Sequence, residues 1–191
     1  MRWLKMKTEK EKMLAGEMYN AGDIELIKDR LIAKKLCYKY NNLVPDAKEK
    51  KKLVLQELLS TEQSPYIEPD FYCDYGYNIK VGENFYVNHN CVFLDVNTIT
   101  IGNNVMIGPA VQIYTATHPL EAKKRNSGLE LGYPIIIGDN VWIGGGAIIQ
   151  PGVKIGNNAV IGAGAVVTKD IPANVFAGGN PVRAIKEIDN N

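Results

Sequence analysis

The chain contains two histidines, His89 and His118, and they are the first candidates for chemistry. Imidazole is the side chain whose ordinary pKa lets it accept and release a proton near neutral pH. His118 precedes Pro119 at the edge of a segment, residues 115–134, that interrupts an otherwise regular apolar spacing. Loops on rigid scaffolds often carry functional groups, so His118 is a candidate general base; the alternative is a surface histidine before a turn proline. His89 is interpreted as structural or as a contact at the rim of a site.

Aliphatic residues recur at every sixth position over most of the chain after Phe71. The repeat falls on Val81, Val87, Phe93, Ile101, Ile107, Ile113, Ile137, Ile143, Ile149, Ile155, Ile161 and Val167, with a two-residue slip after Phe93. A second small or aliphatic residue lies four positions after each of the last six: Val141, Ala147, Val153, Ala159, Ala165 and Ile171. A six-residue period is typical of a hexapeptide β-helix. It predicts a mostly β fold, in which coils bury their inner faces by stacking and Gly- and Asn-containing segments form the corners.

The residues before the repeats predict a small helical segment. Helices are expected over residues 3–20, over 24–41 with Asp23 as its N-cap, and after Pro45. The residues expected near their packed faces are Met6, Lys10, Met13 and Leu14, then Ile24, Ile27, Leu31, Leu36 and Tyr38, then Leu53, Leu55, Leu58 and Leu59. The predicted organisation is a helical segment at 1–60, a β-helix at 61–185 with a protruding loop at 115–134, and a C-terminal tail at 186–191.

Composition and charge exclude several classes of function. Residues 1–60 contain 14 Lys and Arg against 9 Asp and Glu, and the remainder contains 8 against 12. Without an aromatic-rich basic motif, the lysines are interpreted as a solvated helical face and not as a nucleic-acid site. No apolar run reaches the roughly 18 residues of a membrane span, and the N-terminus lacks an apolar signal segment. Cys37, Cys73 and Cys91 have no CxxC spacing, which favours reduced packing thiols in a cytoplasmic protein.

Several segments together resemble one family. The stretch IGDNVWIGGGAIIQPGVKIGNNAVIGAGAVVTKDIPANVFAGGNPVRAI, residues 137–185, resembles the left-handed β-helix acyltransferases. MLAGEMYNAGDIEL, AKKLCYKYN, FYCDYGYNIKVGENFYVNHNCVFLDV, THPL and RNSGLELGYPIIIGDN resemble one branch of them, the maltose and galactoside O-acetyltransferases. The resemblance covers nearly the whole chain. It implies a left-handed β-helix, an acetyl-CoA-dependent sugar O-acetyltransferase without a metal, and a homotrimer with sites between subunits.

The resemblance also implies roles for single residues on the acceptor side. His118 lies where the family carries its catalytic histidine, which would take a proton from a sugar hydroxyl, the 6-hydroxyl in this interpretation. The residues implied to contact the acceptor are Asp74, Asn88, Asp95, Glu130 and a residue near Asn20. Asp74 favours maltose or glucose, because the galactoside branch tends to carry Ser there. Val96 stands where the galactoside pattern has a second acidic residue beside Asp95.

On the donor side, the positions implied to bind coenzyme A are Trp142, Gly145, Ala163, Thr168, Lys169, Arg183 and Lys186. Small residues let a ligand approach the backbone, and cations suit phosphate groups. The implied mechanism is direct transfer, in which the sugar oxygen attacks the thioester carbonyl and the Gly145 N–H stabilises the oxyanion. No cysteine or serine lies in a nucleophile motif, so no acetyl-enzyme is expected.

The sequence disfavours three other interpretations. A γ-type carbonic anhydrase needs three histidine ligands for zinc, and two histidines cannot supply them. A non-catalytic solenoid scaffold would not need a histidine-bearing loop that interrupts its repeats. An antibiotic or xenobiotic O-acetyltransferase of the same fold is disfavoured by the N-terminal helical segment. The physiological acceptor stays open, because a pocket of a few polar groups discriminates weakly among sugars.

Overall fold

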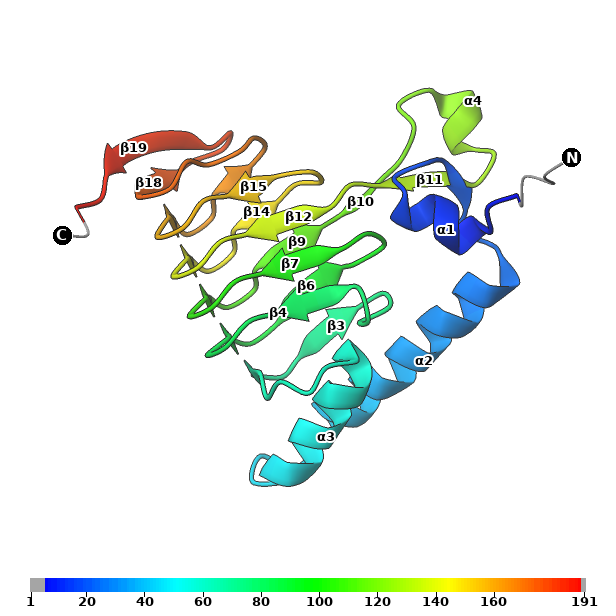
Figure 1. The fold of residues 1–191 in the computed structure, drawn as a ribbon, viewed down its shortest axis with the longest axis horizontal. Helices are drawn as coiled ribbons and strands as arrows, with labels where there is room; N and C mark the ends of the chain where they lie inside the picture. The colour runs from blue at the N-terminus through cyan, green and yellow to red at the C-terminus, as the bar shows by residue number, and fades with distance from the viewer. Residues whose placement is uncertain (1–5, 190–191) are drawn as a thin grey trace, which may run out of the picture.

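The computed structural model describes residues 6–189, in which three sheets of mainly parallel strands form the faces of a prism (Figure 1). The first face holds β2 (Tyr66–Ile67), β5 (Tyr86–Val87), β8 (Met106–Ile107), β13 (Trp142–Ile143), β16 (Val160–Ile161), β18 (Val175–Gly178) and β19 (Arg183–Glu187). The second face holds β3 (Phe71–Cys73), β6 (Cys91–Leu94), β9 (Gln112–Tyr114), β14 (Ile148–Ile149) and β17 (Val166–Val167). The third face holds β4 (Ile79–Val81), β7 (Ile99–Ile101), β12 (Ile135–Ile137) and β15 (Lys154–Ile155).

The chain crosses the three faces in turn and so forms stacked coils. Coil 1 contains β2, β3 and β4; coil 2 contains β5, β6 and β7; coil 3 contains β8, β9 and β12; coil 4 contains β13, β14 and β15. Coil 5 contains β16, β17 and a bridge from Ile171 to Ile155, and β18 starts the next coil. We call the corners between the faces corner 1–2, corner 2–3 and corner 3–1. The last strand, β19, runs antiparallel to β18 and extends to Glu187, into the segment predicted as a tail.

The six-residue pattern marks the interior of this prism, as predicted. The repeat positions from Val87 to Val167 are all buried, and Val81 is partly buried against the same core. The second set, from Val141 to Ile171, is buried as well. Equivalent side chains therefore stack on one another along the axis, and the predicted parallel β-helix of hexapeptide repeats is confirmed.

At corner 3–1, asparagine side chains of successive coils form a ladder of hydrogen bonds. The side-chain amides of Asn84, Asn104, Asn140 and Asn158 each donate to the side-chain oxygen of the asparagine in the next coil, at 2.8–3.1 Å, and Asn174 accepts the last of these bonds. Each of these residues has a φ between +53° and +59°, a left-handed conformation that Asn tolerates better than most residues. Glycine precedes the ladder because the coils meet closely: a Cβ at Gly138 would lie 2.8 Å from the backbone nitrogen of Asn157.

Corner 2–3 collects the departures from the repeat. The two-residue slip after Phe93 lies there, between β6 and β7. The interrupting loop leaves and re-enters at the same corner of coil 3, between β9 and β12, and contains β10 (Ala116–Thr117), α4 (Ala122–Arg125) and β11 (Leu129–Gly132). Figure 1 shows the loop with α4 projecting from the solenoid next to the N-terminal helix.

The first helix of the N-terminal segment is shorter than predicted. α1 covers Glu9–Leu14, and the described part of the predicted helix before it is not helical; residues 3–5 lie outside the described range. Thr8 and Glu11 form a capping box that starts the helix, and Gly16, with a φ of +71°, ends the turn that follows it. The chain then forms β1 (Tyr19–Asn20), a strand that the helical prediction missed because its partner, β11, is distant in sequence.

The second helix has the predicted bounds and cap but buries a different face. α2 spans Ile24–Asn41, with Asp23 accepting from the Glu25 N–H at 2.9 Å. The predicted packed residues Ile24, Ile27, Leu31 and Tyr38 are exposed, and only Leu36 of that set is buried. The buried residues are Leu26, Ala33, Leu36, Cys37 and Tyr40. Apolar residues lie on several sides of this helix, and the side that packs with the solenoid core carries Ala33, Leu36, Cys37 and Tyr40.

The third helix, α3, spans Lys48–Leu59 and buries Leu55, Leu58 and Leu59 as predicted. Leu53 is exposed, and Val54 is buried in its place. α2 and α3 lie together against the first coils, at the end of the solenoid opposite to β19 (Figure 1). They cover an end of the β-helix core that would otherwise meet water, which is the role of a cap in a solenoid.

The inward direction of the repeat positions can be tested by a substitution at Ile155. Its side chain is 2% exposed and stacks between coils 3 and 5, on the strand that pairs with β12. Ile155→Ala should lower the free energy of unfolding by about 2–5 kcal/mol, because it leaves a cavity in the core. Lys154→Ala, on the outward side of the same strand, should change it by less than about 0.5 kcal/mol. Urea unfolding at one fixed protein concentration measures both, and equal effects would contradict the assigned inward face.

Candidate active site

His118 lies on a hairpin anchored at corner 2–3. It follows β10, which pairs antiparallel with β11, and β11 pairs in turn with β1 of the N-terminal segment. The imidazole is exposed, whereas Pro119 beside it is buried. Arg125 Nη1 donates to the carbonyl oxygens of Pro119 at 3.1 Å and Leu120 at 2.9 Å. The turn that follows His118 is therefore held by a side chain from the other side of the loop.

Two of the predicted acceptor residues, Asp74 and Glu130, lie within electrostatic reach of each other near this hairpin. Asp74 follows β3 at corner 2–3, and Glu130 lies on β11. Burial raises the pKa of Asp74; the charge of Arg30 opposes that shift, and the charge of Glu130 adds to it. Tyr19 donates its hydroxyl to Glu130 Oε2 at 2.7 Å. Carboxylates from coil 1 and from the loop thus share one polar neighbourhood.

Arg30, Tyr19 and Tyr75 belong to this neighbourhood but were not singled out from the sequence. Arg30 donates to the Tyr75 hydroxyl and to the Ala21 carbonyl oxygen, both at 2.6 Å. Tyr19 and Tyr75 are buried together in a small apolar cluster with Met13. None of these residues has a motif of its own, and their partners lie far away in the chain. Tyr19 and Tyr75 lie inside segments that resemble the family, whereas Arg30 lies between two of them, so no signal in the sequence marks Arg30.

Asp95 is fully buried and does not line the surface. Its Oδ1 accepts from the backbone N–H groups of Asp74 at 3.0 Å and Tyr75 at 2.9 Å, so it supports the corner that carries Asp74. Its Oδ2 is buried without a hydrogen-bond partner in the described chain. Burial raises the pKa of Asp95 to about 7, the backbone amide of Tyr75 opposes the shift, and the charge of Asp74 adds to it.

A second buried polar residue, Asn97, joins the loop and the N-terminal segment to coil 2. Its Nδ2 donates to the carbonyl oxygens of Gly132 at 2.9 Å and Met13 at 3.2 Å. Its own N–H donates to Thr115 Oγ1 at 2.9 Å. Three segments therefore meet at one amide, which fixes where the hairpin leaves the solenoid.

Asn20 lies on β1, at the exposed side of the same sheet. Its Oδ1 accepts from the Gly22 N–H at 2.8 Å, and its N–H donates to Glu9 Oε2 at 2.6 Å. β1 lies beside the strand that carries Glu130, with Asn20 paired to Leu129. The predicted N-terminal contact is thus near the loop, although its side chain is engaged in a local turn.

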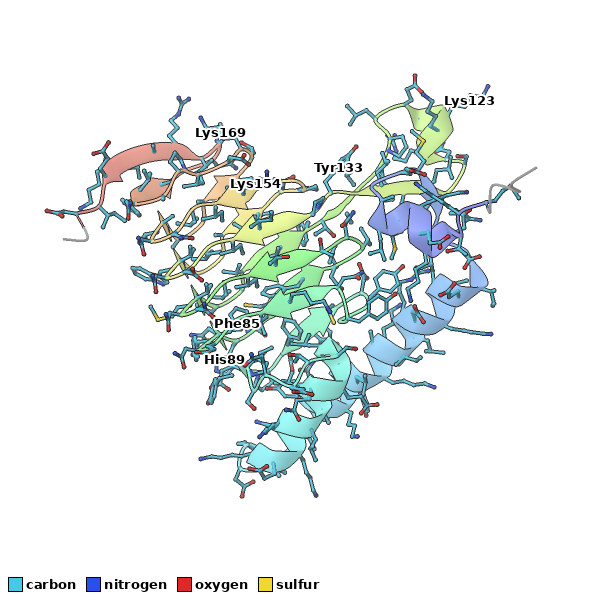
Figure 2. All side chains as sticks on the ribbon, viewed as in Figure 1. Phe85, His89, Lys123, Tyr133, Lys154 and Lys169 are labelled. Carbon is cyan, nitrogen blue, oxygen red and sulfur yellow. The ribbon has the colours of Figure 1, made fainter. Side chains whose placement is uncertain are left out.

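Asn88 lies at a different corner of the prism. It follows β5 and precedes β6, at corner 1–2, and its Oδ1 accepts from the His89 N–H at 2.7 Å. His89 is exposed and its Nδ1 contacts the Pro69 carbonyl oxygen. Figure 2 shows His89 beside the first coils, on the side away from the loop tip that Lys123 marks. Within one chain, the second face separates Asn88 from the corner that carries Asp74.

The predicted donor-side residues are also divided between corners. Gly145 and Ala163 lie at corner 1–2 of coils 4 and 5, one coil apart. Trp142 is 52% exposed on the first face, and Arg183 and Lys186 lie on the exposed strand β19 of that face. Thr168 and Lys169 are exposed at corner 2–3 of coil 5. One chain therefore does not gather these seven residues into one groove.

Glycines occupy corner 1–2 of coils 4 and 5, and they differ in the space around them. A Cβ at Gly145 would lie 3.1 Å from the Pro109 carbonyl oxygen, so this position leaves little room for a side chain. Gly146 and Gly164 have left-handed φ values and open space where a Cβ would lie. The small residues found there fit a narrow arm lying along the main chain.

The described residues, 6–189, contain no group of three or more His, Cys, Asp or Glu side chains placed to hold a metal ion. Over the same range, no helix has both the length and the apolar character needed to cross a membrane.

Comparison with known proteins agrees with this geometry. Residues 12–61 match the maltose acetyltransferase hexapeptide capping motif, and residues 134–169 match the bacterial transferase hexapeptide with six repeats. The structure is similar to that of a maltose O-acetyltransferase from Clostridium difficile 630, with a TM-score of 0.94 and 56% identity over 96% of this chain and 99% of the other.

The chain belongs to the maltose and galactoside O-acetyltransferase family.

Two further similar acetyltransferase structures contain ligands. A galactoside acetyltransferase in complex with coenzyme A has a TM-score of 0.92 and 42% identity, over 97% of this chain and 93% of the other. A hexapeptide-repeat acetyltransferase of Vibrio cholerae O1 biovar eltor, complexed with acetyl coenzyme A, has a TM-score of 0.88 and 35% identity, over 96% and 100%. The α2–α3 cap of the present acetyltransferase lies within the part that matches the capping motif.

Asp95 makes stability depend on pH in a defined direction. Its pKa is raised in the folded protein to about 7, against about 4 in an unfolded chain, so the fold favours the protonated form. Stability from this group is complete below pH 4 and is lost as the pH rises toward 7. The free energy of unfolding should fall by up to about 4 kcal/mol over that range, at about 1.4 kcal/mol for each pKa unit.

Asp95→Asn isolates this contribution, because Asn keeps an oxygen acceptor and does not titrate. Urea unfolding between pH 4 and pH 8, at fixed protein concentration, should show a smaller decline with pH for the variant than for the unsubstituted protein. Parallel declines would show that Asp95 is ionised throughout and that the assigned protonation is wrong.

Proposed function

We propose that this acetyltransferase moves the acetyl group of acetyl-CoA directly to a hydroxyl of a sugar such as maltose or glucose, the 6-hydroxyl by preference, with His118 as general base. The observation that carries the proposal is the anchoring of the His118 hairpin at the corner that also bears Asp74 and Glu130. An exposed imidazole thus lies on the same edge of the prism as carboxylates that can accept hydrogen bonds from an uncharged polyol.

The acceptor side of the site is built from Asp74 and Glu130. Their oxygens can accept hydrogen bonds from sugar hydroxyls, and Arg30 nearby offsets part of their charge. Asp95 does not reach the surface. It accepts hydrogen bonds from the backbone N–H groups of Asp74 and Tyr75 and so supports the position of Asp74. A sugar bound against Asp74 would present one hydroxyl to the imidazole.

Acetyl-CoA fits as the second substrate at corner 1–2. The backbone at Gly146 and Gly164 has open space for a pantetheine arm, and the exposed cations Arg183 and Lys186 on the first face suit the phosphates of the nucleotide end. Trp142 lies on that face beside Gly145. The Gly145 N–H makes no hydrogen bond within the described chain, so it is available to an oxyanion.

In the proposed reaction the acetyl group passes directly from acetyl-CoA to the sugar. The imidazole of His118 accepts the hydroxyl proton as the sugar oxygen attacks the thioester carbonyl carbon. The Gly145 N–H stabilises the negative charge on the carbonyl oxygen. The carbon–sulfur bond then breaks, and the departing thiolate takes the proton from His118. The products are the sugar ester and coenzyme A, and no group of the protein is acetylated.

A second copy of the chain would complete the site. Asn88, Gly145 and Ala163 lie at corner 1–2, whereas His118, Asp74 and Lys169 lie at corner 2–3. The outward positions also differ between faces: the first face carries Tyr66, Met106 and Trp142 along its length, and the third face carries Lys80, Thr100, Ile136 and Lys154. A homotrimer that brings corner 1–2 of one copy to corner 2–3 of the next would join both halves.

The role of His118 is tested against the other histidine of the chain. His118→Ala should lower turnover by about 10²–10⁴, the usual contribution of a positioned general base. Acetyl-CoA binding, measured by calorimetry, should persist because the donor contacts lie elsewhere. His89→Ala should change turnover by less than about tenfold. If His89→Ala is the damaging substitution, or if neither changes thiol release by more than threefold, the mechanism is wrong.

The shared site is tested by mixing subunits. His118→Ala and Asn88→Ala variants should each be weakly active, and co-expression of the two chains should restore activity. Random mixing at equal amounts leaves about a quarter of the interfaces with an intact Asn88 and an intact His118 from different copies. A mixture no more active than its parents, or an active monomer in sedimentation, would argue that each chain carries a complete site.

A further inference from the structure

Two buried thiols face each other where helix α2 meets coil 1. Cys37 lies on α2, and Cys73 is the last residue of β3. Their Sγ atoms are 3.8 Å apart, and their residues are 2% and 6% exposed. Neither thiol has a part in the proposed acetyl transfer. The two sulfurs are brought together only by the packing of the cap on the solenoid.

Solvent reaches this pair through a surface pocket. Both cysteines line it, together with Lys34 and Asn41 of α2 and with Tyr72 beside Cys73. Polar side chains, among them Asn42 and Asp70, line the same pocket as the two cysteines. A small molecule can therefore approach thiols that the surrounding side chains otherwise cover.

The two thiols differ in their tendency to ionise. A hydrogen bond from Cys73 lowers the pKa of Cys37, whereas that hydrogen bond and burial raise the pKa of Cys73. This asymmetry suits a pair in which Cys37 attacks first and Cys73 follows. Cys91 offers the contrast: burial raises its pKa, and its thiol contacts the carbonyl oxygens of Asn88 at 3.2 Å and Gly108 at 3.3 Å.

We propose that Cys37 and Cys73 form an oxidisable dithiol site that takes a small-molecule disulfide as its reaction partner. The Cys37 thiolate attacks one sulfur of that disulfide and releases one small thiol, which leaves a mixed disulfide on Cys37. Cys73 then loses its proton and attacks Cys37 Sγ, and the second small thiol leaves. The protein gains one disulfide and loses two hydrogens, and the small-molecule disulfide is reduced to two thiols.

The new bond would connect the cap covalently to the solenoid. A disulfide needs its sulfur atoms about 2.05 Å apart, so the pair must close by less than 2 Å from its present separation. Tyr40 and Asn41, one helical turn along α2, already hold coil 1 through the carbonyl oxygens of Ile67 and Phe71. The elements on both sides are therefore held in place for closure.

The test is a thiol count on the folded protein after exposure to glutathione disulfide. Two of the three thiols should disappear, peptide mapping should join the Cys37 and Cys73 peptides, and dithiothreitol should restore all three. Cys91→Ser should still lose two thiols and is the matched control. Cys37→Ser and Cys73→Ser should form no intramolecular disulfide.

Two outcomes would overturn the proposal. One is retention of all three thiols by the folded protein under conditions that oxidise the urea-unfolded chain. The other is a disulfide that includes Cys91. The result on the unsubstituted protein and on Cys91→Ser decides the matter even if the Cys37 and Cys73 variants do not fold. The test measures no acetyl transfer, so it is independent of the proposed function.

Discussion

Stacking of each coil on the next is the constraint on which the rest of the structure depends. The core of the prism is narrow, so every coil must place an aliphatic side chain at the same inward position. The asparagine ladder at corner 3–1 holds successive coils in that register. A shift of one residue in a coil would expose its inward repeat residue and break the ladder, at two contacts for the inner asparagines Asn104, Asn140 and Asn158. The repeat is therefore strict wherever the chain does nothing but stack.

Because the coils stack so strictly, extra residues are tolerated at one corner, and several residues of the proposed site lie there. Corner 2–3 receives the slip of coil 2 and the hairpin of coil 3, and Asp74 follows β3 at the same corner of coil 1. Asp95 and Asn97 lie beneath it, fully or nearly fully buried, and their hydrogen bonds go to backbone groups of three different segments. Burying such groups has a cost in stability, which is partly offset by those hydrogen bonds. They fix the positions of Asp74 and of the hairpin.

The sequence was sufficient to predict the solenoid, because its signal is local and repeats many times. The face that α2 buries could not be predicted in the same way: apolar residues lie on both sides of the helix, and the choice depends on Cys73, Ile67 and Phe71 of a distant coil. β1 was missed for a similar reason, since its partner strand lies in the loop. Arg30 and Tyr19 could not be singled out, because their hydrogen-bond partners, Tyr75 and Glu130 respectively, are far away in the chain. The slip after Phe93 was visible in the sequence, but only the structure shows that it shares a corner with the loop.

The residues proposed for the site are divided between two corners of one chain. A prism separates its edges by the width of a face, so no side chain at corner 1–2 can reach across the second face to corner 2–3 of its own chain. Asn88 and Gly145 lie at the first edge, and Asp74 and His118 at the second. The rigid stacking that makes the solenoid stable also prevents it from folding its two edges toward each other. A site that needs both edges must therefore obtain one of them from a neighbouring copy, so that catalysis and assembly would depend on the same geometry.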